Sequence, residues 1–155
     1  MVQHAKTGGS RVFVGSMIPQ VASRPRGTTP VSELLAYNNT LQLMSQQEGI
    51  VFEKILSSPW CRCTDTGKLM NLGTVETEAT FGNVVVLRDQ RETLTAGGRA
   101  VIARWMASGN LLVVTHGANI SALTGVSPAS GEIVVVKGGG NDVMDAGVGG
   151  RVDQL

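Results

Sequence analysis

A short apolar run, Leu112 to Thr115, stops at His116 and Gly117, and a helix-like stretch, Asn119 to Leu123, follows directly. A run of this length and β-branched content is typical of a strand buried on both faces in a parallel sheet. In such sheets, the side chain just after the strand faces the crevice where ligands bind. A histidine there can bind an anion, move a proton or ligate a metal. The alternative is a buried or capping histidine without a ligand.

Strand-like and helix-like segments alternate along the chain. The strands are predicted at residues 50–56, 111–115 and 133–136, and the helices at residues 33–48, 58–70, 88–107 and 119–123. The helix predicted at residues 58–70 begins with Ser58 as its N-cap residue and Pro59 as its first helical residue. The alternation predicts an α/β fold with three layers, α/β/α, and a mostly parallel central sheet.

The length of 155 residues suits a single domain, which we place at residues 1–136. Within it, residues 8–30 are dominated by glycine, proline, serine and arginine, and we predict irregular structure there. The glycine-rich tail, residues 137–155, is predicted to be disordered.

The composition excludes several classes of partner. A net charge of +1 gives no reason to expect nucleic acid or an anionic membrane, and an aromatic content of 4% argues against a base-stacking surface. No stretch approaches the roughly 18 apolar residues of a membrane-spanning helix. Cys61 and Cys63 are too few for a structural metal site, so no metal is predicted and reduced thiols are expected. The amino-terminal residues lack the apolar core of a signal peptide, which predicts a cytoplasmic protein as written, or a periplasmic one if a leader was lost.

The string LSSPWCRC places polar residues between a predicted strand and a predicted helix, as the string VVTHGANI does around His116. We call these two strings the polar junctions, and we expect both to lie at the same edge of the sheet. Arg62 falls in the first turn of the helix predicted there. A guanidinium, free amide donors and the positive end of a helix together form a receptor for phosphate, to which His116 would add a donor. The alternative for Arg62 is a solvated surface position. No GxSxG or C-x5-R spacing is present, so a serine hydrolase and a cysteine phosphatase are excluded.

The strings SSPWCRCTDTGKLM and LLVVTHGANISALTGVSPASGEIVVV resemble the histidine phosphatase superfamily, which has the phosphoglycerate-mutase-like fold. The closest resemblance is to its small bacterial phosphatases. The family is metal-free and uses no cofactor. Its members carry a nucleophilic histidine in an R-H-G or R-H-A motif right after the first strand, and this histidine becomes phosphohistidine. The resemblance implies hydrolysis of a small phosphomonoester, with the phosphorylated substrate or inorganic phosphate as the partner.

The resemblance also implies roles for single residues. Arg62 matches the phosphate-binding arginine, and His116 matches the second histidine that contacts the phosphate. Their neighbours Ser58 and Gly117 are expected to contribute to substrate binding.

The nucleophile motif matches the string VQHAKT, which makes His4 the candidate nucleophile. Gln3 stands where the family has an arginine, and a neutral amide does not replace a cationic clamp on a phosphate dianion. The general acid has no clean match, and Glu76 and Glu78 are assigned from position alone.

The amino-terminal third departs from the family. Only Met1 and Val2 precede the nucleophile motif, so the first strand is predicted to be short or missing. Either another segment fills its place, with Arg11–Gly15 as the candidate, or the product folds poorly, because neighbouring strands would keep unpaired backbone groups. Residues 8–49 do not match the family, and a compensated frameshift in the gene is one hypothesis for this.

Three functions are therefore compatible with the sequence. The first is a histidine phosphatase that acts through phospho-His4. The second is a catalytically inactive relative, or a degraded gene product, that at most binds phosphate. The third is a structural or interaction domain in which the two polar junctions are only helix caps.

Overall fold

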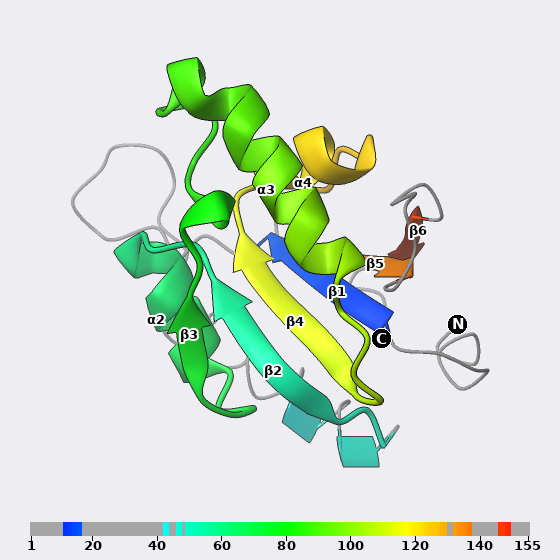
Figure 1. The fold of residues 1–155 in the computed structure, drawn as a ribbon. Coiled ribbons are helices and arrows are strands. Elements are labelled where there is room, and N and C mark those ends of the chain that lie inside the picture. Colours follow the sequence, from blue (N-terminus) through cyan, green and yellow to red (C-terminus); the bar gives the residue numbers. More distant parts are fainter. Residues whose placement is uncertain are drawn as a thin grey trace.

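The computed structural model describes residues 42–43, 46–47, 49–129 and 132–137, together with the backbone of two further strands (Figure 1). Within these residues six strands form one sheet in the order β3-β2-β4-β1-β5-β6. Their bounds are Arg11–Ser16 for β1, Phe52–Ser57 for β2, Val75–Thr77 for β3, Asn110–Thr115 for β4, Ile133–Lys137 for β5 and Ala146–Gly149 for β6. The described α-helices are α2, Cys61–Leu69, α3, Arg91–Ala103, and α4, Gly117–Thr124.

Four neighbouring strands, β3, β2, β4 and β1, run parallel, and β5 and β6 continue the sheet in antiparallel orientation. Helices α3 and α4 cover one face and α2 covers the other (Figure 1). This confirms the α/β class and the mostly parallel sheet. The parallel strands all end at the same edge, so the loops that follow them share one side of the molecule.

Strand β4 lies between the two hydrophobic cores. Leu111 and Val113 pack in the core under α3 and α4, whereas Leu112 and Val114 pack in the core under α2. Successive side chains of a strand point to opposite faces, so a central strand of a three-layer fold is apolar at every position. Burial on both faces therefore explains why the sequence of β4 is a continuous apolar run.

Strand β1 lies inside the sheet, where a strand was predicted to be short or missing. This strand lies between β4 and β5, parallel to β4, with Ser16 beside Thr115 in the register. The candidate segment Arg11–Gly15 therefore fills the slot, and it gives backbone partners to the strands on both sides. The prediction of irregular structure over residues 8–30 is wrong at 11–16, where the sequence RVFV has high β propensity.

Two further boundaries differ from the prediction. Strand β5 runs through Lys137, and β6, inside the tail predicted to be disordered, pairs antiparallel with β5. A glycine-rich strand has no apolar alternation, so its pairing leaves no pattern in the sequence. Of the helix predicted over residues 33–48, the described positions 42–43 and 46–47 are helical, and the others lie outside the described residues.

Two helices begin later than predicted. Helix α2 starts at Cys61 with Trp60 as its N-cap residue, not with Ser58 and Pro59. The Ser58 hydroxyl lies instead in a buried contact with His116. Residues 88–90 form a short 3-10 turn, η3, ahead of α3, which ends at Ala103 and so is shorter than the predicted 88–107. None of the described helices is long and apolar enough to span a membrane.

Candidate phosphate-binding site

The two polar junctions of the sequence meet at the carboxyl edge of the sheet. Strand β2 pairs in parallel with β4, so their ends lie side by side, with Ser57 opposite Val114. The Ser58 N–H donates to the Val114 carbonyl at 2.9 Å, which extends this pairing one residue past β2. Helices α2 and α4 then both begin at this edge. The topology thus brings the first turn of α2 against His116, the N-cap residue of α4.

Arg62 and His116 are in direct contact. The Arg62 Nη2 lies 3.0 Å from His116 Nδ1, and Ser58 Oγ lies 3.0 Å from His116 Nε2. A guanidinium only donates hydrogen bonds, so Nδ1 must accept, and in the neutral ring Nε2 carries the proton and donates to Ser58 Oγ. His116 is 3% exposed, and its imidazole is held on both sides.

Burial is the main cause of an unusual pKa at His116. Burial and, secondly, the positive charge of Arg62 lower the pKa of His116 from 6.5 to about 4. The imidazole is therefore neutral at pH 7. A bound dianion beside both groups would oppose this effect, because a negative charge favours the imidazolium.

This lowered pKa predicts a loss of stability in acid. An unfolded histidine titrates near 6.5 and the folded His116 near 4, so the unfolded state takes up the proton first as the pH falls. The contribution of His116 to stability is complete above about pH 6.5 and is lost as the pH falls through about 4. Urea denaturation at pH 7 and pH 4.5 should show the wild type losing about 2 kcal/mol more than His116→Asn. Equal losses in the two proteins would contradict the buried, neutral state.

Two more side chains complete the surroundings of His116. The Trp60 ring meets the imidazole edge to face, with centroids 5.8 Å apart and an interplanar angle of 81°. The Cys63 Sγ lies 3.7 Å from Nε2. Burial raises the pKa of the Cys63 thiol, although Arg62 acts in the opposite direction. Because the thiolate is the nucleophilic form of cysteine, Cys63 is poorly suited to covalent catalysis.

The contact between Ser58 and His116 is not a catalytic serine–histidine pair. A general base must present a lone pair to the serine hydroxyl, whereas Nε2 carries a proton here. The other ring nitrogen contacts the cationic Arg62, where a catalytic triad has a carboxylate. This geometry agrees with the exclusion of a serine hydrolase from the sequence spacing.

The structure brings together four of the six candidate residues. Arg62, His116 and Ser58 are in contact, and Gly117 is the first residue of α4, directly after His116. The other two, His4 and Gln3, lie outside the described residues. In the sequence they precede β1, whose carboxyl end is at the edge that holds His116.

The two carboxylates assigned by position differ in their surroundings. Glu76 forms a surface ion pair with Lys54, at 2.9 Å, between the neighbouring strands β3 and β2. Glu78 directly follows β3 at the carboxyl edge, where its N–H donates to the Ser57 carbonyl. Its Oε1 accepts hydrogen bonds from the Thr80 N–H and hydroxyl, each at 3.1 Å. Of the two, Glu78 is at the edge of the site.

Asn119 fastens the loop after β3 to α4. Its side chain is 2% exposed, and its Nδ2 donates to the carbonyls of Gly82, at 2.6 Å, and Phe81, at 3.4 Å. Its Oδ1 accepts from the Val84 N–H at 3.3 Å. The Thr115 hydroxyl donates to the same Phe81 carbonyl. No role for Asn119 was predicted from the sequence, although this residue belongs to the string that resembles the family motif.

Trp60 and Cys63 also lie in this site, whereas the sequence favoured packing roles for both. Both flank Arg62 closely in the sequence, which is the signal that could have found them. Among the described residues no group of His, Cys, Asp and Glu side chains is arranged to hold a metal ion.

Comparison with known proteins identifies the fold. No protein-family model and no curated protein matches the chain. The solved structure of the protein histidine phosphatase SixA complexed with tungstate is 16% identical, with a TM-score of 0.58 over 90% of this chain and 94% of that one. Mycobacterial glucosyl-3-phosphoglycerate phosphatase Rv2419c is 15% identical, with a TM-score of 0.59 over 92% and 98%. Phosphoglycerate mutase from Plasmodium falciparum is 10% identical, with a TM-score of 0.58 over 93% and 92%. The chain therefore has the histidine phosphatase fold, which is also that of the phosphoglycerate mutases.

Proposed function

We propose that the chain binds inorganic phosphate, or the phosphoryl group of a small phosphomonoester, at the site formed by Arg62 and His116. One observation carries the proposal. The Arg62 guanidinium and the His116 imidazole lie 3.0 Å apart where two parallel strands end and two helices begin. The fold adds support, because proteins that share it are named phosphatases and a phosphoglycerate mutase.

A donor of Arg62 has no described partner. Its Nε is buried and makes no hydrogen bond among the described residues. A buried donor without an acceptor costs about 1–3 kcal/mol. A phosphate oxygen would supply the acceptor, and the guanidinium fork would then bind two oxygens at once. The amides of the first turn of α4, which begins at Gly117, would add donors at the positive end of that helix.

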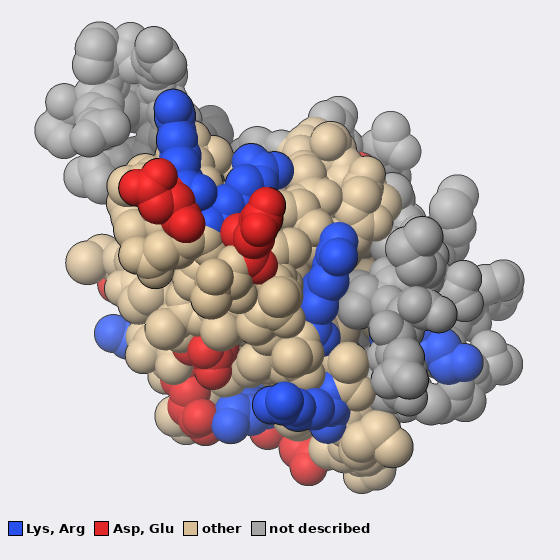
Figure 2. All heavy atoms as spheres, turned by 45° about the horizontal axis from the view of Figure 1, so that its top comes forward, with Lys and Arg blue, Asp and Glu red and all other residues tan. Residues whose placement is uncertain are grey.

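The charge distribution suits a small ligand. Figure 2 shows basic and acidic side chains interspersed over the described part of this face. A long nucleic acid needs a continuous basic surface to neutralise many phosphates, whereas a single phosphoryl group needs only one cationic site. Arg62 would provide it.

The position of β1 favours a phosphate-binding relative without catalysis over an active phosphatase. In the family the nucleophilic histidine follows the first strand directly, but the strand in this place ends at Ser16, and His4 comes before it. For His4 to reach His116, the segment from His4 to Arg11 would have to run back along the whole length of β1. Gln3 would then supply a neutral amide where the family has an arginine.

Hydrolysis through phospho-His4 is the second candidate, and the position of Glu78 favours it. In this reaction His4 would attack the phosphorus atom and the alcohol would leave with a proton from the carboxylic acid. Water would then release phosphate from the phosphohistidine. Glu78 lies at the correct edge of the sheet to be that acid. In the family that the sequence resembles, this chemistry needs no metal.

Phosphate binding and turnover can be measured separately. Inorganic phosphate and tungstate should raise the melting temperature of the wild type, and Arg62→Ala should abolish the shift. Arg104→Ala removes the same charge from an exposed position next to the end of α3 and should keep the shift. Neither the wild type nor His4→Ala should hydrolyse p-nitrophenyl phosphate above the uncatalysed rate.

Two results would overturn parts of this proposal. If neither anion shifts the melting temperature of the wild type, the chain does not bind phosphate at this site. If p-nitrophenol is released in a burst with formation of phosphohistidine, and His4→Ala abolishes both, the chain is an active histidine phosphatase.

A further inference from the structure

The geometry points to Trp60 as a residue that positions Arg62 for phosphate binding, an inference that rests on the function proposed above. The Arg62 Cζ lies 5.2 Å from the centre of the Trp60 ring. A guanidinium within about 6 Å of an aromatic centroid is attracted by the negative face of the ring, and tryptophan gives the strongest attraction.

Arg62 has few other contacts that could fix its orientation. Among the described residues no carboxylate pairs with Arg62, its Nε is without a hydrogen bond, and Nη2 contacts His116. A planar guanidinium binds two oxygens of a phosphate only when its fork faces them. The indole can hold the guanidinium plane while leaving Nε free.

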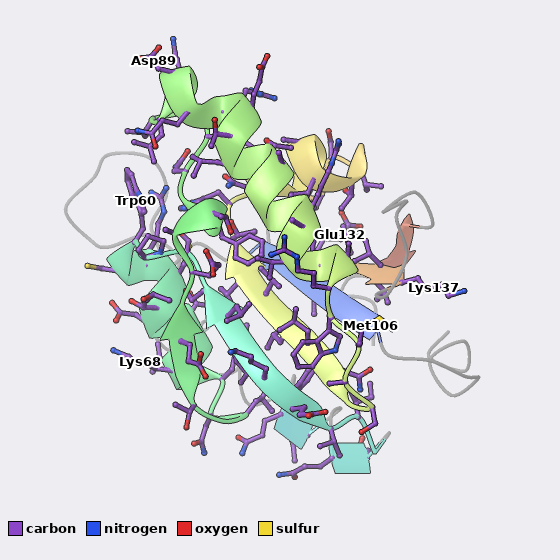
Figure 3. The ribbon with its side chains drawn as sticks, viewed as in Figure 1. Trp60, Lys68, Asp89, Met106, Glu132 and Lys137 are labelled. Atoms are coloured by element: carbon purple, nitrogen blue, oxygen red, sulfur yellow. The ribbon has the colours of Figure 1, made fainter. Side chains whose placement is uncertain are left out.

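Trp60 itself is held in place by helix α2. Its carbonyl accepts from the Cys63 N–H at 2.8 Å and from the Thr64 N–H at 3.1 Å, so its backbone forms the start of the helix. Figure 3 shows the side chain beside this end of α2. The same ring contacts His116 edge to face. The Trp60 ring therefore contacts both groups of the proposed site from a backbone position that the helix fixes.

A simple packing role makes a different prediction. If Trp60 only filled space, leucine would replace it as well as phenylalanine, because both side chains are apolar. If the ring acts through its attraction for the guanidinium, phenylalanine keeps part of the effect and leucine keeps none.

The experiment measures the Kd of inorganic phosphate by titration calorimetry on the full chain. We expect Trp60→Leu to weaken binding about tenfold, and Trp60→Phe to weaken it about threefold. The control is Trp105→Phe, which changes the other tryptophan. The Trp105 Nε1 donates to the Gly109 carbonyl in the loop before β4, at the opposite end of that strand from His116. That variant should bind like the wild type.

The outcomes separate this inference from the function on which it rests. A wild type that does not bind phosphate overturns the proposed function and the inference together. A wild type that binds, with a Trp60→Leu variant that binds equally well, overturns the inference alone. Equal weakening in the leucine and phenylalanine variants also contradicts it. The inference is also contradicted if the Trp60 variants lose affinity for p-nitrophenyl phosphate but not for inorganic phosphate, because the ring would then contact the ester group.

Discussion

Arg62→Lys should weaken phosphate binding by about 100-fold, although it keeps the positive charge. Lysine presents a single ammonium group and cannot bind two phosphate oxygens with a planar fork. Hydrogen bonds to charged groups contribute about 1.5–3 kcal/mol, and 1.4 kcal/mol corresponds to a factor of ten in affinity. The substitution also removes the contact of Arg62 with His116 Nδ1. Titration calorimetry with inorganic phosphate at pH 7 measures the change.

The control for this prediction is Arg104→Lys, at an exposed position next to the end of α3. This variant should keep the wild-type Kd. If Arg62→Lys binds phosphate within threefold of the wild type, the fork does not contact the anion, and the site needs only a positive charge or lies elsewhere.

Asn119→Ala should lower the free energy of unfolding by about 3 kcal/mol. The substitution leaves the Gly82 carbonyl and the Val84 N–H without the partners that the buried amide gives them. Each buried polar group left unpaired costs about 1–3 kcal/mol. The Phe81 carbonyl keeps its hydrogen bond from Thr115, so it adds less to the loss. Urea denaturation at pH 7 measures the effect.

The matched control is Asn110→Ala. The Asn110 side chain makes one exposed hydrogen bond, from Nδ2 to the Val51 carbonyl at 2.9 Å, so its loss should cost less than about 1 kcal/mol. If both variants lose the same small amount of stability, Asn119 does not fasten the loop to α4 as described.

The pairing of Arg62 with His116 could be predicted because it depends on local patterns and one topological rule. The apolar run at 111–115 indicates a strand buried on both faces, and LSSPWCRC follows a second strand. If both strands belong to one parallel sheet, the residues that follow them share an edge. The structure has this arrangement, with β2 beside β4.

The features that the sequence did not predict depend on contacts between distant segments. Helix α2 has Trp60 as its N-cap residue, and the Ser58 hydroxyl contacts His116, 58 residues away in the sequence. The pairing of β6 depends on β5, and no side-chain pattern marks it. Asn119 acts on a loop about 35 residues earlier in the chain, as its bond to the Val84 N–H shows. Local propensities carry no information about such contacts.

The most direct test of the shared phosphate site is a crystal structure of the chain with tungstate, an analogue of phosphate. We predict one tungstate ion whose oxygens lie within about 3 Å of both the Arg62 guanidinium and the His116 imidazole. Tungstate bound at another place, with Arg62 and His116 still in direct contact, would contradict the account.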